Sequence, residues 1–159
     1  MLNKEDESRQ EKESTGSRKT IAGGRAAYAY QAVSEYVKLP VNEEDKTKYR
    51  ARVVSMPMMI KNNGFGAAMA FYFSKQNDQD RAYKAIYEQI TLWLKQSGIL
   101  AEDEPDLMYK ITHSSIDEYK TMTNEAMALL AWMKRFAEGM IKRKKTNRKQ
   151  PDQAGESDG

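Results

Sequence analysis

Four acidic residues around Pro105 form the densest group of side chains that could act as general acid and base. Paired carboxylates do such work when burial or a neighbouring charge displaces their pKa values. Here they stand between two predicted helices, where a solvated loop and an acidic helix start explain them more simply. We therefore predict no catalytic role for this group, which consists of Glu102, Asp103, Glu104 and Asp106.

Nucleophilic and metal-binding residue types are scarce in the 159-residue sequence, which has no Cys and a single His, His113. This composition excludes disulfides, thiolate nucleophiles and multi-His metal clusters, and it weakens any mechanism that needs a His relay. Ser114 and Ser115 precede a predicted helix and are better explained as caps than as nucleophiles. We predict a protein without enzymatic activity, cofactor or metal site.

The glycine-containing stretch from Asn63 to Gly66 resembles a fragment of a phosphate-binding loop. It lacks a third glycine, no predicted strand precedes it, and no Lys-Ser or Lys-Thr pair follows it. A turn between two helices accounts for it better.

Helical periodicity dominates the chain between Ile21 and Ile141. Ser115 and Glu118 have the spacing of a capping box, and the stripe that follows them alternates steps of three and four residues as far as Met140. No comparable segment alternates with period two. We predict an all-α fold, a compact bundle of about six helices.

The same patterns predict individual helices and their buried sides. The first helix buries Tyr30, Val33 and Val37 and ends at Pro40. The second starts at Asn42 and ends at Asn63-Gly64. A third, from Gly66 to about Gln76, is apolar on nearly every side and should be central. Asp78 caps a fourth helix that Gly98 ends, and Pro105 opens a short fifth. Some tyrosines beside the stripes should be partly exposed, among Tyr28, Tyr36, Tyr72, Tyr87 and Tyr109.

Both ends of the chain differ from the helical part. Residues 1–20 carry five basic and five acidic residues with almost nothing apolar after Leu2, and residues 142–159 are first basic and then acidic. We predict two disordered tails flanking one helical domain, residues 21–141. The longest apolar run, Ala126–Met133, is far shorter than the about 20 residues of a membrane span. We expect a cytoplasmic protein without membrane contact.

Positive charge is concentrated in two places, although the net charge is only +3. Eight basic residues and one acidic residue lie between Lys134 and Lys149, and the predicted second helix is also rich in Lys and Arg. Such a distribution suits phosphate binding, but a basic helix end also complements the helix dipole. The charge pattern leaves nucleic-acid contact and a merely solvated surface both open.

Three stretches are similar to one known family: residues 24–30, 48–71 and 114–138. Their most specific parts are the element Asn63-Gly64 and the run from Trp132 through Lys134, Arg135 and Phe136 to Ala137. Together they resemble the small subunit of the type III-B CRISPR effector, the Cmr complex, over about residues 25–141. Trp132 flanks the core stripe of the last helix and could face a partner.

The resemblance implies a helical subunit without catalytic activity that lines up with copies of itself in the inner filament of the effector. Its partners would be the other Cmr subunits, further copies and the backbones of guide RNA and target RNA. Base pairing carries sequence specificity in such complexes, so cations on rigid helices suffice. We predict RNA contacts by Arg25, Lys48, Arg52, Lys61, Lys134, Arg135 and Lys142.

Two alternatives remain. The chain could be a protein–protein scaffold that does not touch RNA, with a basic tail that only aids solubility. A helix-turn-helix DNA regulator is less compatible, because the basic end of the last helix is C-terminal, whereas base-reading residues are usually N-terminal.

Overall fold

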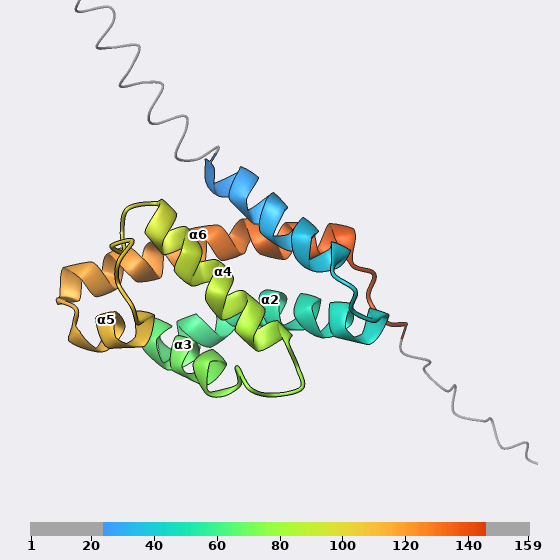
Figure 1. Cartoon of the computed structure of the whole chain (residues 1–159), viewed down its shortest axis with the longest axis horizontal. Coiled ribbons are helices and arrows are strands. Elements are labelled where there is room, and N and C mark those ends of the chain that lie inside the picture. Colours follow the sequence, from blue (N-terminus) through green and yellow to red (C-terminus); the bar gives the residue numbers. More distant parts are fainter. Residues whose placement is uncertain (1–23, 146–159) are drawn as a thin grey trace, which may run out of the picture.

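The computed structural model describes residues 24–145, which form six helices and no strand (Figure 1). This confirms the predicted all-α class. The first helix covers residues 24–38. It is followed by α2 (Glu43–Asn63), α3 (Phe65–Ser74), α4 (Ala82–Gln96), α5 (Leu107–His113) and α6 (Ile116–Met140). The predicted tail of residues 1–20 and most of the predicted C-terminal tail lie outside the described residues.

The two longest helices, α2 and α6, form the antiparallel pair on which the other helices pack (Figure 1). The Asn42 side chain caps α2, and Ser115 and Glu118 form the predicted capping box of α6. At the end of α2, Gly64 adopts a φ of 88°. Close to this turn the backbone N–H of Gly66 donates to Tyr119 Oη at 2.8 Å, joining the start of α3 to the first turn of α6.

A polar cluster inside the bundle fixes three helices relative to one another. Gln89 of α4 accepts a hydrogen bond from Tyr49 of α2 at its side-chain oxygen, at 2.8 Å. The Gln89 Nε2 donates to the backbone carbonyl of Ala32 in the first helix at 3.1 Å. The backbone carbonyl of Gln89 accepts from Tyr28 Oη at 2.6 Å. Tyr49 is fully buried, so these bonds replace water where little water can reach.

The first helix is rotated from its predicted orientation. Tyr30 is 55% exposed, whereas Ala29 and Tyr36 are buried with Val33. The expectation that Tyr30 belongs to the core was therefore wrong. Tyr36 stacks on Tyr49 with ring centroids 3.9 Å apart, and burial raises its pKa to about 12. An alanine stripe allows this helix to approach its neighbours closely, and the bulkier Tyr30 is directed outward.

Two other predictions need correction. Helix α3 lies at the edge of the bundle rather than at its centre, since Phe71 and Phe73 are partly exposed while Met69 is buried. Helix α4 is not capped by Asp78; instead the Asp80 carboxylate accepts from the backbone N–H of Ala82 at 3.1 Å. Some of the five tyrosines beside the stripes were expected to be partly exposed. Tyr109 is exposed, Tyr28 and Tyr87 are half-buried, and Tyr36 and Tyr72 are buried.

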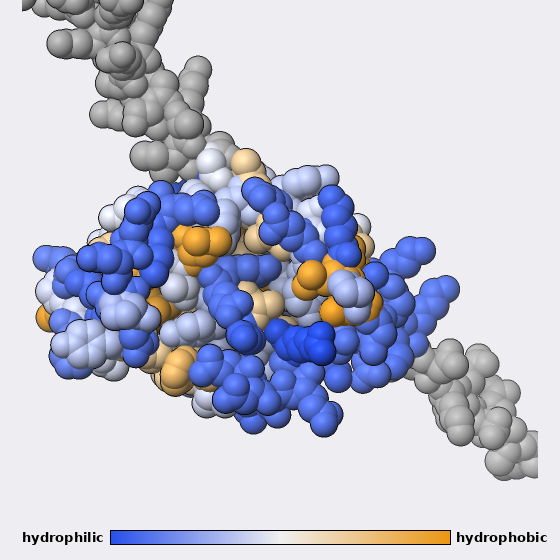
Figure 2. Space-filling view, in the orientation of Figure 1, coloured by the Kyte–Doolittle hydropathy of each residue, from blue (hydrophilic) through white to orange (hydrophobic). Residues whose placement is uncertain are grey.

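The face formed by the first helix and α4 is mostly hydrophilic (Figure 2). Its hydrophobic side chains form small separate areas rather than one continuous patch. Among the described residues, no helix combines the length and the apolarity that crossing a bilayer requires.

Candidate nucleic-acid interface

The seven predicted RNA-binding residues do not form one surface. Three of them contact carboxylates, three lie along the pair formed by α2 and α6, and one lies beside a group of exposed aromatic residues. The first group is Arg25, Lys48 and Arg52, the second is Lys61, Lys134 and Lys142, and the last is Arg135.

Arg25 is held by Glu125 of α6. Its Nε and Nη2 donate to the two carboxylate oxygens at 2.8 and 3.0 Å, and both side chains are largely covered. The Trp93 indole N–H also donates to Glu125, at 2.8 Å. These hydrogen bonds, led by that of Arg25, lower the pKa of Glu125 below its usual value. The guanidinium therefore has a carboxylate partner that a phosphate would have to displace.

Lys48 and Arg52 also have carboxylate partners. Lys48 lies 3.2 Å from Glu44 one turn earlier on α2. Arg52 lies 3.3 Å from Asp80 and places its guanidinium 4.7 Å from the centre of the Tyr83 ring. Arg52 thus joins α2 to α4, a structural task that the charge pattern alone did not reveal.

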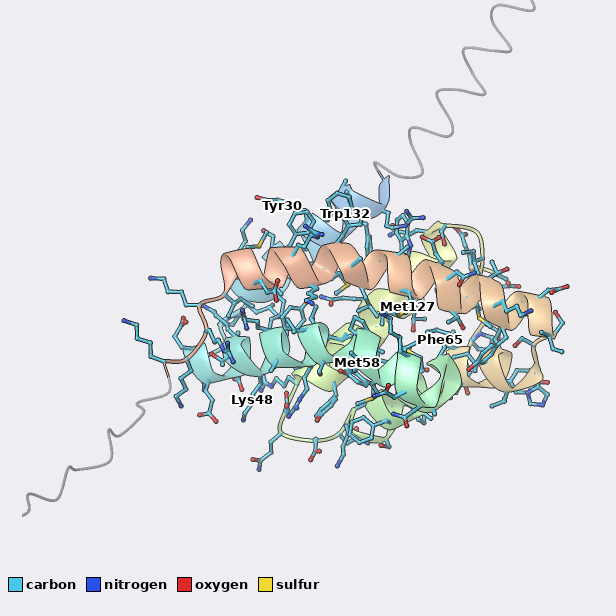
Figure 3. All side chains as sticks on the ribbon, turned by 180° about the vertical axis from the view of Figure 1, so that it is seen from behind. Tyr30, Lys48, Met58, Phe65, Met127 and Trp132 are labelled. Atoms are coloured by element: carbon cyan, nitrogen blue, oxygen red, sulfur yellow. The ribbon has the colours of Figure 1, made fainter. Side chains whose placement is uncertain are left out.

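Lys61 and Lys134 are exposed residues of the two helices of the α2–α6 pair. Met127 lies between α6 and α2 in Figure 3, and Lys134 follows it by two helical turns, so both point to the same side. Lys61 lies in the last turn of α2, beside the Gly64 turn. Both lysines are exposed, and within residues 24–145 neither forms an ion pair with a carboxylate.

Arg50 belongs to the same side, although it was not among the predicted contacts. It precedes Lys61 by three helical turns, whereas Arg52 is rotated by about 200° around the helix. Its Nε is buried and has no hydrogen-bond partner among the described residues. A guanidinium has five N–H donors, so the four on the terminal nitrogens, and not the buried Nε, are the ones that a phosphate would contact. Helical spacing was the sequence signal that could have identified Arg50, because it lies three full turns before Lys61, whereas Arg52 is rotated to the other side of the helix.

Arg50, Lys61, Lys134 and Lys142 are called the α2–α6 cationic face below. Eleven residues separate Arg50 from Lys61, which corresponds to about 16 Å along α2. At the end nearer Lys142, a hollow of about 330 Å³ is lined by Lys142, Arg143 and Lys144 and by the opposing Glu43, Glu44 and Thr47. The two carboxylates partly offset the positive charge of the three basic residues at that end.

Arg135 points to another side of α6, beside Trp132. Trp132 is 41% exposed and stacks on Phe136 at 5.9 Å between ring centroids, and Tyr30 meets Phe136 edge-on at 5.4 Å. Tyr30 and Trp132 lie together along the edge of α6 that faces away from α2 (Figure 3). The exposure of Trp132 agrees with its prediction. Tyr30, Trp132 and Phe136 are called the aromatic patch below.

The acidic residues around Pro105 do not converge into a pocket. Glu102, Asp103 and Asp106 are exposed, and Asp106 caps α5 by accepting from the Met108 backbone N–H. Within residues 24–145, no group of three or more Asp, Glu or His side chains is placed to hold a metal ion.

Comparisons with known proteins identify first the class and then the family. A family model described as CRISPR-associated protein (Cas_Cmr5) matches residues 21–140, so this helical chain is a CRISPR-associated protein. The chain belongs to the Cas_Cmr5 family, which confirms the resemblance seen in the sequence.

A known protein and a solved structure, both from Thermus thermophilus, agree with this assignment. The protein "CRISPR system Cmr subunit Cmr5" is 27% identical over 116 residues, which cover 73% of this chain and 91% of that protein. The crystal structure of a CRISPR-associated Cmr5 family protein superposes with a TM-score of 0.57 at 26% identity, covering 74% of this chain and 93% of the other.

Proposed function

We propose that this chain is a non-catalytic small subunit of a type III-B CRISPR effector that targets RNA in antiviral defence in the cytoplasm. It associates with the other Cmr subunits and with copies of itself in the inner filament. Its α2–α6 cationic face helps to line the groove that holds guide RNA and target RNA. The observation that carries the RNA contact is that Arg50 and Lys61 lie on one side of α2, about 16 Å apart, and that Lys61 and Lys134 have no carboxylate partner within residues 24–145.

Charge and rigidity are sufficient for this role. Guide and target recognise each other by base pairing, so the protein needs to recognise only backbone charge and helical shape. The α2–α6 pair holds its cations on two helices that pack directly against each other. An extended row of cations suits a phosphate backbone better than a pocket would.

The alternative function is a protein–protein scaffold without direct RNA contact. The aromatic patch favours it, because exposed aromatic side chains are typical of protein interfaces. Because the aromatic patch and the α2–α6 cationic face lie on different sides of the molecule, protein contacts at the patch do not exclude RNA contact at the face, and a test of the RNA contact separates the two functions.

Reconstitution of the effector with a variant carrying Lys61→Glu and Lys134→Glu tests the RNA contact. We expect weaker retention of the guide–target duplex. The dependence of log affinity on log salt should flatten by about 0.7 for each single-strand phosphate, and by about 0.9 for each duplex phosphate, that the variant no longer binds. The matched control carries Lys75→Glu and Lys84→Glu. These substitutions make the same charge change at the C-terminal end of α3 and on α4, away from the cationic face. Unchanged RNA affinity in the first variant at low salt would reject the contact.

Treatment of the assembled particle with RNase separates the scaffold from the RNA-lining subunit. Release of this chain by RNase supports an RNA-dependent position in the particle. If the chain stays bound after complete RNA digestion and the Lys61 and Lys134 variant binds RNA normally, the scaffold function is correct.

A further inference from the structure

A groove with a hollow of about 300 Å³ lies between the first helix and α4, which run antiparallel to each other (Figure 1). Two exposed carboxylates line it, Glu35 from the first helix and Glu88 from α4. Leu92 of α4 also lines it and is 49% exposed. The remaining lining residues are uncharged. This hollow is called the α4 groove below.

Three lysines near the α4 groove do not line it. Lys38 follows Glu35 by one turn and is exposed, and Lys84 lies 3.8 Å from Glu88 in an exposed contact, which is therefore weak. Lys95 donates to a backbone carbonyl beyond the end of α4 at 3.2 Å. The inside of the groove thus combines negative charge with an exposed apolar side chain. It suits an occupant that has both a cation and an apolar group.

The described chain begins at one end of this groove. Gly24 lies against α4, since a Cβ at that position would be 3.9 Å from Cη2 of Trp93. Tyr28, one turn after Gly24, lines the near end of the groove. The residues that precede Gly24 are therefore attached beside the groove.

The amino acids just before Gly24 have the chemistry that the groove requires. Residues 14–23 contain no Asp or Glu, and their two charged side chains are those of Arg18 and Lys19. Ile21 is the single large apolar residue between residues 3 and 23. Cations and an apolar side chain thus occur together within four residues.

The length of this segment also matches the groove. Glu35 follows Gly24 by eleven residues, which corresponds to about 16 Å along the first helix. An extended chain advances about 3.3 Å per residue, so Ile21 reaches about 10 Å and Lys19 about 16 Å from Gly24. Gly23 supplies the residue type that most readily allows the chain to reverse its direction.

We propose that residues 18–22 bind in the α4 groove of their own chain as an extended segment. Ile21 packs against Leu92, and the two cations that precede it lie beside the two carboxylates of the groove. The contact covers an exposed leucine and places two cations on the side formed by the first helix and α4. Residues 18–20 then do not belong to the disordered tail that the sequence predicted. The proposal goes beyond the RNA contact and does not depend on it.

Disulfide trapping tests the position of the segment, because the sequence contains no Cys. Leu92→Cys is combined in turn with Thr20→Cys, Ile21→Cys and Ala22→Cys in the full chain. Disulfide formation under mild oxidation is followed by mass. Alternate residues of an extended segment point to opposite sides, so we expect position 21 to react at least about tenfold faster than positions 20 and 22.

The matched control combines Ile21→Cys with Leu39→Cys. Leu39 is also 49% exposed, but it follows Gly24 by fifteen residues, about 22 Å along the first helix. Ile21 in the groove is too far from this position, so we expect little disulfide there. Thermal melts confirm that every variant is folded.

Limited digestion with trypsin measures the same contact without cysteines. The groove variant carries Glu35→Gln, Glu88→Gln and Leu92→Ser. It should be cleaved after Arg18 and Lys19 about tenfold faster than the wild type, because cleavage follows the fraction of the segment that is not bound.

Two controls accompany the digestion. Cleavage after Arg9, outside the proposed segment, should be equally fast in the wild type and in the groove variant. A second variant, with Glu102→Gln, Asp103→Asn and Leu39→Ser, makes the same chemical changes outside the groove and should be cleaved like the wild type.

Three results would overturn the proposal. Disulfide rates that rise steadily from position 20 to position 22 would show only that the segment is tethered nearby. Equal cleavage after Arg18 and Lys19 in the wild type and in the groove variant would show that the groove does not bind them. A disulfide that joins two chains would show that the occupant comes from a second copy. None of these results affects the test of the RNA contact, which uses other residues and another readout.

Discussion

Arg25 and Glu125 lie one hundred residues apart in the sequence and join the first helix to α6 by two hydrogen bonds, of 2.8 and 3.0 Å. Their side chains are only 20% and 15% exposed. Trp93 adds a bond from α4 to the same carboxylate. Three helices therefore meet at one carboxylate, and we expect Arg25 to contribute to stability more than to RNA binding.

Substitution Arg25→Ala should lower the free energy of unfolding by about 1–3 kcal/mol, because it leaves a largely covered carboxylate with only the indole N–H. Thermal denaturation measures this loss. Lys84→Ala is the control, since its contact with Glu88 at 3.8 Å is exposed and should contribute under about 1 kcal/mol. An Arg25→Ala protein with unchanged stability and weaker RNA binding would restore the original prediction for Arg25.

Glu118 should make stability depend on acid pH. The hydrogen bond from Lys110, at 2.7 Å, and those from Ser115 lower its pKa to about 2, from 4.5 in the unfolded chain. A carboxyl whose folded pKa is the lower one stabilises the fold above its unfolded pKa, and this contribution disappears as pH falls from 4.5 towards 2.

The comparison of wild type with Glu118→Gln isolates this effect. We expect the wild type to melt at the higher temperature near neutral pH and the difference to shrink as pH falls below about 4.5. A melting-temperature difference that is the same at every pH would show that the charge of Glu118 does not contribute.

Gly64→Val should destabilise the fold by about 1–3 kcal/mol. Gly64 has a φ of 88°, and a Cβ there would lie 3.3 Å from Tyr119 Oη, so both backbone and packing oppose a side chain. Gly139→Ala is the matched control, because a Cβ at that helical position meets nothing within 4 Å. It should be neutral or stabilising by up to about 1 kcal/mol. Equal melting temperatures for wild type and Gly64→Val would contradict the strained turn.

Arg50→Met and Arg52→Met should have different consequences although they are two residues apart. Loss of Arg50 should weaken RNA binding and reduce the salt slope by about 0.7, with little change in melting temperature. Loss of Arg52 should lower the melting temperature, because it removes the contacts with Asp80 and Tyr83. RNA titrations at several salt concentrations and thermal melts of both variants separate the two roles. Identical behaviour of the two variants would contradict this division.

The helices with strong local signals could be predicted from the sequence alone. The capping box of Ser115 and Glu118 and the side-chain cap of Asn42 act within one turn, so their sequence spacing is enough to locate both helix starts. The glycine stop after Asn63 is equally local, because only its backbone φ is unusual.

The orientation of the first helix and the partners of the cations could not be predicted in this way. Tyr30 and Tyr36 both fit an apolar stripe, and the choice between them depends on how closely the alanines approach other helices. The partner of Arg25 is remote in sequence, and that of Arg52 lies on another segment, so neither forms a recognisable spacing. A charged residue is identified by sequence, but whether it is neutralised is decided by the tertiary fold.

The bonds made by Gln89 have a consequence for how the subunit can respond to force. Its side-chain amide and carbonyl bind groups on two other helices, so sliding either helix by one residue would leave polar atoms unsatisfied in the interior. Such a bundle resists internal shear and turns as one rigid body. Bending of an array of these subunits would therefore be confined to the seams between neighbours.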